Sequence, residues 1–411
     1  MSDVLVSYDF PPMIGGAHSW LYQLYRRWPT EVQVLTAQYA KDEHERSEQK
    51  EFDRLRHGSL QIWRKADATH QIDIRSFQYL SSLWHQASDI ARIGRTAAAS
   101  ERTAYDVIHA LRAFPEGVAA WLSWRRNHRR SRLVTYVHGE EILVSQTSRQ
   151  LAMLSKRVYQ DSHLVIANSK NTQKILESEY PGVESVSIHP GVDVKLFANL
   201  PDFREKRRNT KGWPQGTVIV LTLARMEPRK NHAMVIRAVA KLRAEGVSVA
   251  LVCGGDGPER QSLESLAYDL GVSPWVHFEG AVREEEKPNL FASADIFAMP
   301  SISVGAMIEG FGIVFLEAAA AGLPAVCGNT GGQLEAVRNE RTGLAVDGES
   351  LEAVASAINR LIRDGCLRRE LGEAGRGWAA ENDWEIQGKK VQSAIRMRTV
   401  YKSNDLVRMC R

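Results

Sequence analysis

The sequence predicts an α/β protein with two doubly wound, parallel-sheet domains that face a central cleft. Short apolar segments typical of buried strands alternate with helical segments in both halves of the chain. At 411 residues the chain is too long for one ordinary hydrophobic core, which favours two domains. Ligands of open α/β sheets bind at the carboxyl ends of the strands, so we expect the functional residues in the loops that follow the strands.

The composition is that of a soluble globular protein that does not bind nucleic acid. Hydrophobic residues make up 44% and charged residues 25%, and the net charge is only +4. The N-terminus has no signal-peptide pattern and no apolar run is long enough to span a membrane, so we expect a cytoplasmic protein. The cysteines show no metal-ligand spacing and fit a reducing cytosol; they are Cys253, Cys327, Cys366 and Cys410.

Strands are expected in both halves of the chain. In the first half they are residues 4–8, 32–36, 105–110, 133–137, 163–167 and 185–189. In the second half they are residues 217–223, 249–253, 276–278, 296–299, 325–327 and 344–346. Helices are expected at 17–27 and 76–103, and residues 41–56 form a charged, exposed segment. The polar and basic stretch 195–215 predicts the linker between the domains.

The first strand leads into a loop that ends in Gly15 and Gly16 before a helix. A strand, a glycine-rich loop and a helix form the usual βα unit in which the backbone approaches a phosphate. The loop lacks the Gly-x-Gly-x-x-Gly pattern, so it does not indicate a dinucleotide site. The two glycines alone are equally compatible with a structural turn.

His138 follows the strand 133–137, at the edge where ligands of open sheets bind. A single histidine at the end of a strand is also a common structural residue, so both roles remain open.

Residues 121–132 carry a basic patch beside Trp121 and Trp124. Its basic residues are Arg125, Arg126, Arg129, Arg130 and Arg132. Such a patch can bind an anionic membrane surface. A solvated helix end carries the same types of residue and is the simpler interpretation.

Arg225 and Lys230 lie in the loop after the strand 217–223. There they are placed to hold a diphosphate, arginine as a planar fork and lysine as a point charge. Solvated surface charge is the alternative interpretation, but the dipole of the following helix disfavours cations at its start. This local conflict favours a functional role.

The segment from Glu309 to Glu317 places two glutamates around a Gly-Phe-Gly turn. Gly310 and Gly312 allow the backbone to approach a ligand closely, and a helix that starts after Gly312 offers unpaired N–H groups to an anion. Carboxylates accept paired hydrogen bonds from sugar hydroxyls. An isolated pair of glutamates is more simply solvated, so the assignment depends on the other motifs.

Together these motifs resemble those of a family 4 retaining glycosyltransferase of GT-B fold over nearly the whole chain. The family pattern is met in order by Gly15-Gly16, His138-Gly139, Asn168-Ser169, Pro190 to Asp193, Arg225 with Lys230, Gly254 to Pro258, Pro300-Ser301 and Glu309 with Glu317. Each motif is weak alone, but eight in order are specific. The chain departs from the pattern between Ser301 and Glu309, where its insert is longer than in many members.

The resemblance implies two domains and a role for each candidate residue. Residues 1–195 would bind the acceptor, residues 196–384 would bind the nucleotide sugar, and the last helix, 385–411, would pack back on the first domain. Glu317 would bind the ribose diol, Glu309 the donor sugar, Arg225 and Lys230 the leaving diphosphate, and His138 would lie beside the anomeric region. Further donor contacts are implied for Gly15, Gly16, Val282, Gly310, Phe311, Gly312, Ile313 and Val314.

The implied reaction is transfer of a hexose from a nucleotide-diphosphate sugar to a hydroxyl acceptor with retention of configuration. The chain contains no Asp-x-Asp motif, and we expect neither a metal nor another cofactor; fixed cations and helix N-termini would stabilise the departing charge. The acceptor is a small molecule or a glycolipid, and peripheral contact with the inner face of a membrane stays open. The alternatives are a nucleotide-sugar epimerase of the same fold and a non-catalytic sugar-binding relative. The motif order disfavours the first, and the retained His138, Lys230 and both glutamates disfavour the second.

Overall fold

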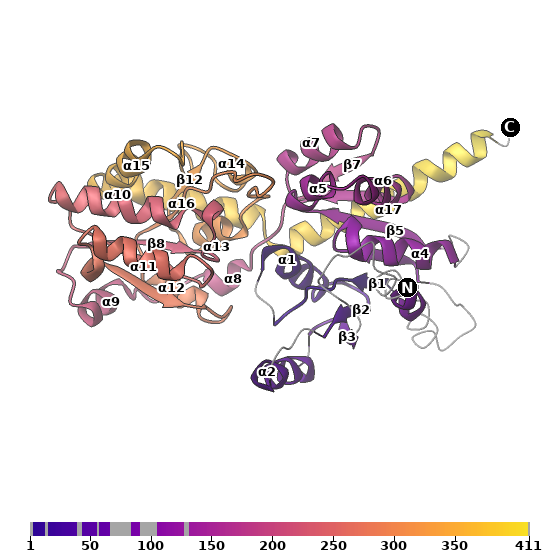
Figure 1. Cartoon of the computed structure of the whole chain (residues 1–411), viewed down its shortest axis with the longest axis horizontal. Helices are drawn as coiled ribbons and strands as arrows, with labels where there is room; N and C mark the ends of the chain where they lie inside the picture. The colour runs from indigo at the N-terminus through magenta and orange to yellow at the C-terminus, as the bar shows by residue number, and fades with distance from the viewer. Residues whose placement is uncertain are drawn as a thin grey trace. The chain divides into compact units, whose positions relative to one another are not determined.

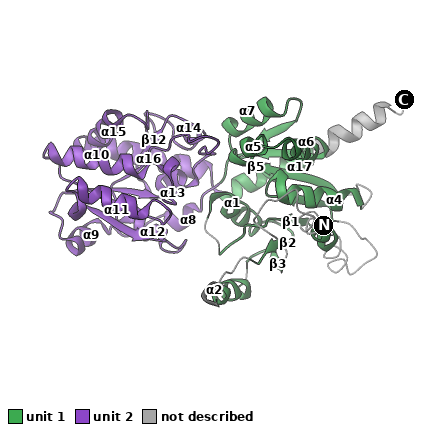
Figure 2. Cartoon of the chain, viewed as in Figure 1, with its two compact units in different colours: residues 1–190, 384–411 green, residues 191–383 purple. Residues whose placement is uncertain are grey.

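The computed structural model describes residues 3–12, 15–38, 43–55, 57–65, 84–90, 105–126 and 131–409. The chain forms two compact units (Figure 2). Unit 1 comprises Met1–Pro190 and Trp384–Arg411, and unit 2 comprises Gly191–Asp383. Each unit is built around one parallel sheet with helices packed on it (Figure 1). The prediction of two doubly wound, Rossmann-like units is therefore confirmed.

The sheet of unit 1 has the strand order β3-β2-β1-β4-β5-β6-β7. Its strands are β1 Asp3–Val6, β2 Val32–Ala37, β3 Leu60–Lys65, β4 Val107–Ala110, β5 Arg132–Val137, β6 Leu164–Ala167 and β7 Ser185–Ser187. Its helices are α1 Gly16–Tyr25, α2 Glu43–Arg54, η1 Ala113–Gly117, α4 Val118–Arg126, α5 Glu140–Ser145, α6 Arg149–Asp161, α7 Lys170–Glu179 and α17 Trp384–Met409. The strand order reverses between β1 and β4, so the loops after these strands diverge and leave room for a ligand.

The sheet of unit 2 has the strand order β10-β9-β8-β11-β12-β13. Its strands are β8 Val218–Leu223, β9 Val249–Gly254, β10 Val276–Gly280, β11 Ile296–Met299, β12 Ala325–Gly328 and β13 Gly343–Val346. Its helices are α8 Val194–Phe197, α9 Arg204–Lys211, η2 Pro228–Lys230, α10 His232–Ala244, α11 Arg260–Asp269, η3 Ser273–Trp275, α12 Lys287–Ala292, α13 Ile313–Ala321, α14 Gln333–Ala336, α15 Leu351–Arg363 and α16 Gly365–Glu381. Here the order reverses between β8 and β11.

Small residues bring α13 close to α16 in the core of unit 2. A Cβ atom on Gly375 of α16 would lie 3.4 Å from Cα of Ala319, and one on Gly372 would lie 2.2 Å from the carbonyl oxygen of Gly322. Gly322 ends α13 with a φ of 80°, as predicted for its C-terminal glycine. The close packing fixes the position of α13, whose N-terminus lies at the carboxyl edge of the sheet.

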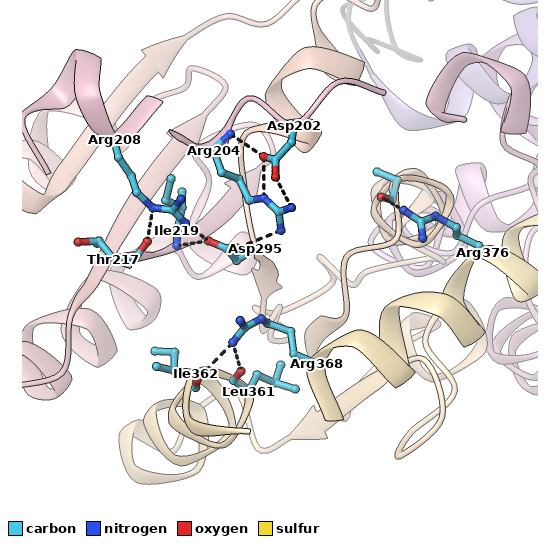
Figure 3. A network of polar contacts seen from close by, with 11 residues as sticks. Asp202, Arg204, Arg208, Thr217, Ile219, Asp295, Leu361, Ile362, Arg368 and Arg376 are labelled. Atoms are coloured by element: carbon cyan, nitrogen blue, oxygen red, sulfur yellow. Dashed lines mark hydrogen bonds and ion pairs between the residues drawn. The ribbon is translucent and has the colours of Figure 1, made fainter. Parts of the chain in front are cut away.

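The predicted linker at 195–215 is wrong, because α8 and α9 of unit 2 occupy it. Arg204 and Arg208, one turn apart on α9, lie 3.2 and 3.1 Å from the two carboxylate oxygens of Asp295 (Figure 3). Asp202 also binds Arg204, and Asp295 accepts from the N–H of Ile219 at 2.9 Å. The polar residues that indicated a linker therefore form ion pairs that attach a helix to the core.

Other differences concern the edge of unit 1. The strand β3 was not predicted, and the charged segment 41–56 contains the helix α2. Most of the predicted helix 76–103 lies outside the described residues, although residues 84–90 are helical. Arg129 and Arg130 of the basic patch also lie outside them.

The helix α17 returns the chain to unit 1. It begins at Trp384, which is buried, and a Cβ atom on Gly388 would lie 3.6 Å from Cδ1 of Leu24 in α1. Val391 and Ile395 are also buried. None of the helices in the described part of the chain combines the length and the apolar character that a membrane span requires.

The turn after β12 packs directly on the loop between β11 and α13, and only glycine fits there. A Cβ atom on Gly332 would lie 2.0 Å from the carbonyl oxygen of Gly310 and 3.0 Å from Cα of Phe311. We predict that Gly332→Ala lowers the free energy of unfolding by about 2 kcal/mol, because the two loops must separate. Urea unfolding measures this loss.

Gly377→Ala is the matched control, because no atom lies within 4 Å of its added Cβ and the residue is exposed within α16. This change should be neutral or stabilise by up to about 1 kcal/mol. Equal unfolding midpoints for Gly332→Ala and wild type would contradict the packing argument.

Candidate functional site

The loops at the carboxyl edge of the unit 2 sheet surround a buried carboxylate, that of Glu309. This residue lies between β11 and α13 and is 9% exposed. Its Oε2 accepts a hydrogen bond from the ammonium of Lys230 and lies 3.3 Å from Nη1 of Arg229. Both cations belong to η2, which follows β8. The ion pairs thus connect the two loops between which the strand order reverses.

The cations decide the charge of Glu309. Desolvation alone would raise the pKa of this carboxyl, but Lys230 and Arg229 hold it below its ordinary value. Glu309 is therefore ionised at neutral pH and held in one place. Such a carboxylate can accept hydrogen bonds from hydroxyl groups without first losing a proton.

Asn231 fixes the segment that carries the two cations. It has a φ of 60° and stands at the start of α10. Its Nδ2 donates to the carbonyl oxygens of Pro300 at 3.0 Å and Gly348 at 2.8 Å. The loop after β8 is thereby joined to the loops after β11 and β13, which limits the freedom of Lys230.

A second buried amide, that of Gln333, fixes the loop that carries Glu309. Its Nε2 donates to the carbonyl oxygens of Ser301 at 3.0 Å and Thr330 at 2.9 Å. Its Oε1 accepts from the N–H groups of Ser301 at 3.1 Å and Gly328 at 2.9 Å. Gln333 thus satisfies four backbone groups in loops that have no regular ladder of their own.

The helix α13 begins directly after the Glu309 loop. Gly312 has a φ of 86°, which favours glycine, and no side chain caps the helix. Phe311 and Phe315 are buried on either side of this start, whereas Ile313 and Val314 are partly exposed. The N-terminal amides therefore combine with the positive end of the helix dipole to suit an anion.

Glu317, one turn into α13, is held by a different lysine. Its Oε1 accepts from Nζ of Lys287 at 3.0 Å, and Lys287 also contacts Glu284 at 2.7 Å. Within the described part of the chain, Oε2 of Glu317 is buried and has no hydrogen-bond partner. Desolvation raises the pKa of Glu317 despite Lys287. An unpaired, buried carboxylate oxygen is well suited to a hydroxyl donor from a ligand.

The structure brings some of the predicted residues together and leaves others apart. Lys230 meets Glu309, but Arg225 is 70% exposed and its Nε lies 3.0 Å from Oε1 of Glu227. Val282 lines a separate cavity of about 540 Å³ between α9 and α12. Sequence reasoning missed two cations. Arg229 stands next to Lys230, which was a usable signal, whereas nothing local marks Lys287 as the partner of Glu317.

His138 lies at the carboxyl edge of the unit 1 sheet, as predicted. Its Nε2 is 2.8 Å from the carbonyl oxygen of Leu111, which can only accept, so Nε2 carries the proton. The ring of Trp20 packs edge-on against it. Burial and the nearby Arg112 lower the pKa of His138 to about 4. The imidazole is therefore neutral, with its Nδ1 lone pair able to accept a hydrogen bond.

The predicted Asn168-Ser169 pair supports His138 rather than standing apart from it. Asn168 Nδ2 donates to the carbonyl oxygen of His138 at 3.2 Å, and Ser169 caps α7 by accepting from the N–H of Thr172. A Cβ atom on Gly15 would lie 2.3 Å from Cε1 of His18, so a larger residue there would have to displace the His18 ring.

The basic patch is partly tied into the protein. Trp121 donates to Oδ2 of Asp161 and Trp124 to the carbonyl oxygen of Ser131, both at 2.8 Å, and both rings pack on the core of unit 1. The guanidinium of Arg125 stacks on Trp121. The tryptophans therefore do not project as membrane anchors. Across the described residues, no group of His, Cys, Asp or Glu side chains is arranged to hold a metal ion.

Comparison with known families identifies the chain. Residues 14–196 match the family described as Glycosyltransferase Family 4, and residues 203–378 match Glycosyl transferases group 1. The chain is also 37% identical over 268 residues to a GDP-mannose-dependent alpha-(1-6)-phosphatidylinositol monomannoside mannosyltransferase of Mycolicibacterium smegmatis, covering 64% of this chain and 70% of that protein. The chain belongs to the family 4 glycosyltransferases. The family resemblance stated from the sequence is confirmed.

Two further relatives extend this family 4 match. A monoacylated-phosphatidylinositol-monomannoside mannosyltransferase of Corynebacterium glutamicum, also GDP-mannose-dependent, is 27% identical over 95% of this chain and 97% of its own. A D-inositol 3-phosphate glycosyltransferase of Corynebacterium jeikeium is 30% identical over 70% and 71%. The chain is therefore a glycosyltransferase.

Solved structures confirm the GT-B fold of this glycosyltransferase. Anabaena HepE in complex with UDP and glucose is 21% identical, covers 96% of this chain and 99% of its own, and superposes with a TM-score of 0.74. Sucrose-phosphate synthase from Thermosynechococcus elongatus is 21% identical, covers 97% and 99%, and gives a TM-score of 0.75.

On the role that the family resemblance implies for Lys230, a fixed cation at the leaving diphosphate, we predict that Lys230→Met lowers turnover by a factor of about 10² to 10³. The fold should persist, since Arg229 still faces Glu309. Initial rates of sugar transfer measure the effect, and Lys241→Met, a lysine paired on the surface of α10, is the control. Near-normal rates for Lys230→Met would contradict its role.

We also predict that Lys287→Met makes stability depend on pH. Without this cation the pKa of Glu317 rises further above its unfolded value. A pKa raised by folding contributes stability at low pH that is lost as the pH rises. The variant should lose about 3 kcal/mol of unfolding free energy at pH 8 and less at pH 5. Urea unfolding at both values tests this, and adding Glu317→Gln should remove the pH dependence. Equal losses at both values would rule out Glu317 as the cause.

Proposed function

We propose that the protein transfers a hexose from a nucleotide-diphosphate sugar to a hydroxyl acceptor, without a metal ion and with retention of the anomeric configuration. The observation that carries this proposal is the ionised, buried carboxylate of Glu309 held by Lys230 and Arg229 beside the uncapped start of α13. A carboxylate that can bind sugar hydroxyls thus lies next to cations and backbone amides that can bind phosphate.

Each residue of unit 2 has a proposed part. Glu309 binds hydroxyls of the donor sugar. Backbone amides contact the sugar and phosphate; they are those of Gly310, Phe311, Gly312, Ile313 and Val314. Lys230 and Arg225 stabilise the charge that develops on the departing diphosphate. Among the described residues Arg225 pairs with Glu227, which is itself partly exposed, so its side chain can turn from Glu227 to a ligand.

The nucleoside is proposed to lie beside Glu317. Its unpaired Oε2 can accept from one ribose hydroxyl while Lys287 holds Oε1. The backbone of Val282 is proposed to meet the base. On unit 1, the acceptor unit of the proposal, Nδ1 of His138 accepts a hydrogen bond from the sugar, and the backbone at Gly15 and Gly16 contacts a phosphate.

The same groups support the proposed retention of configuration and the proposed independence of a metal ion. The fixed cations Lys230 and Arg229 can balance diphosphate charge in the role that a divalent ion has in other transferases. Glu309 is already engaged by two cations, which suits a binding group better than a nucleophile. We therefore favour attack on the same face from which the diphosphate leaves, with the leaving phosphate accepting the acceptor proton.

The relatives guide the choice of donor and acceptor. Two of them are named for GDP-mannose and a phosphatidylinositol mannoside, and a third for D-inositol 3-phosphate. We propose GDP-mannose as the donor and an inositol-containing glycolipid as the acceptor. Peripheral membrane contact would then use the exposed guanidinium groups of the basic patch, not its tryptophans.

A panel of GDP-, UDP- and ADP-sugars tests the proposal by thermal shift. The true donor at about 100 times its Kd should raise the melting temperature by roughly 5–10 °C. Product analysis with and without acceptor then separates transfer from epimerisation, since an epimerase converts the donor alone. The absence of any shift in folded protein would contradict a nucleotide-sugar enzyme, and an anomeric configuration inverted in the product would contradict retention.

A further inference from the structure

A charge cluster joins two segments at the carboxyl edge of the unit 1 sheet. Arg112, between β4 and η1, donates through Nη2 to Oδ2 of Asp9 in the loop after β1. Its Nε lies 3.2 Å from Oε2 of Glu116 in η1. Glu116 is fully buried, and its Oε1 accepts from the N–H of Tyr8 at 3.3 Å. The loop after β1 and the segment after β4 are therefore tied together through Arg112.

The guanidinium of Arg112 balances several carboxylates. Burial lowers its pKa, but Glu116, Asp9 and Glu141 hold it above the ordinary value. Burial also raises the pKa of Glu116 and of Glu141. Removing the cation would leave these carboxyl groups without compensation in a site of low polarity.

The same segment carries the hydrogen-bond acceptor of His138. The carbonyl oxygen of Leu111, which accepts from Nε2 of His138, belongs to the peptide group that joins Leu111 to Arg112. On its other side Leu111 donates its N–H to the carbonyl oxygen of Val6 at 3.0 Å. The position of this carbonyl therefore depends on β1 at one end and on the anchored side chain of Arg112 at the other.

We propose that Arg112 is a positioning residue for the transfer reaction. Through its ion pairs with Asp9 and Glu116 it holds the Leu111 carbonyl under His138, which fixes the Nε2–H tautomer. This inference rests on the proposed role of His138 in binding the sugar and assigns that role a supporting residue. Arg112 itself acts through His138.

The charges around His138 determine how its protonation depends on pH. Among the described residues, charged and titratable groups on neighbouring segments include Arg112, Glu116, Asp9, Glu140, Glu141 and His18. The backbone N–H of His138 donates to Oε1 of Glu141 at 2.6 Å, so this carboxyl is bound at the main chain of His138. Arg112 is the nearby cation that opposes an imidazolium, and the carboxyl groups favour one. Without Arg112 the balance shifts toward protonation of His138.

Direct titration of His138 tests the inference independently of activity. Histidine-selective isotope labelling and NMR give the tautomer and titration midpoint, with His138→Gln used to assign the signal. In Arg112→Gln we expect the midpoint to rise by about one unit or more and the Nε2–H tautomer to lose its dominance. Arg112→Lys keeps the positive charge, so the titration midpoint of His138 should return most of the way to its wild-type value. Arg157→Gln, an exposed arginine paired on α6, is the control and should leave it unchanged.

A second variant tests the inference in case Arg112→Gln does not fold. Arg112→Gln with Glu116→Gln removes the buried carboxylate together with its cation, so it avoids an uncompensated buried charge. In this variant the midpoint should still rise, since Arg112 is absent. An unchanged midpoint and tautomer in folded Arg112→Gln, or in the double variant, would overturn the inference.

The pH dependence of kcat/KM connects the titration to catalysis. In Arg112→Gln, kcat/KM should fall about fivefold more between pH 7 and pH 4 than in wild type, because a midpoint raised from about 4 to about 5 leaves much less neutral imidazole at pH 4, and Arg112→Lys should restore the profile. A uniform loss at all pH values would indicate a purely structural role and overturn the proposal. His138→Ala separates the proposed role of His138 from the positioning role of Arg112. Full activity of this variant would overturn the role of His138 in sugar binding, yet it would leave the titration result for Arg112 intact.

Discussion

The buried ion pair between Lys230 and Glu309 is the contact on which the donor side of the site depends. It connects the loops after β8 and β11, where the strand order of unit 2 reverses. Removing both cations from a buried carboxylate leaves an uncompensated charge, which costs about 3–5 kcal/mol, whereas Arg229 still faces Glu309 when Lys230 alone is removed. The asparagine and glutamine amides of Asn231 and Gln333 restrain the same loops. A sugar and a diphosphate would therefore meet groups that are already in place.

The same arrangement recurs around other carboxylates. Lys287 holds Glu317 on α13, and Arg112 holds Glu116 and Asp9 at the edge of unit 1. Replacing buried ion pairs by apolar residues is often neutral or stabilising, so stability alone does not explain their presence. Fixed charges that need no rearrangement are what stabilises developing charge in a transferase. We infer that the ion pairs of Glu309, Glu317 and Arg112 serve the proposed ligand site, whereas the buried pairs of Asp295 attach α9 to the core.

The features that were predicted correctly depend on residues close together in the sequence. Alternating strands and helices gave two doubly wound units, and Gly312 and Gly322 marked the ends of α13. The family motifs led to Lys230 and Glu309. What the sequence could not predict are pairs formed by distant residues, such as Lys287 with Glu317. The error at 195–215 has the same origin, because the charges of α9 are paired with Asp295 far along the chain.

The most direct test of this account is calorimetric titration of the donor's free nucleoside diphosphate into wild type, Glu317→Gln and Glu309→Gln. If Glu317 binds the ribose, Glu317→Gln should weaken binding by roughly 10- to 100-fold, as expected for a lost hydrogen bond to a charged group. Glu309→Gln should bind the free nucleotide nearly as wild type does and lose affinity only for the complete nucleotide sugar. An unchanged affinity of Glu317→Gln for the nucleotide would contradict the placement of the donor in unit 2.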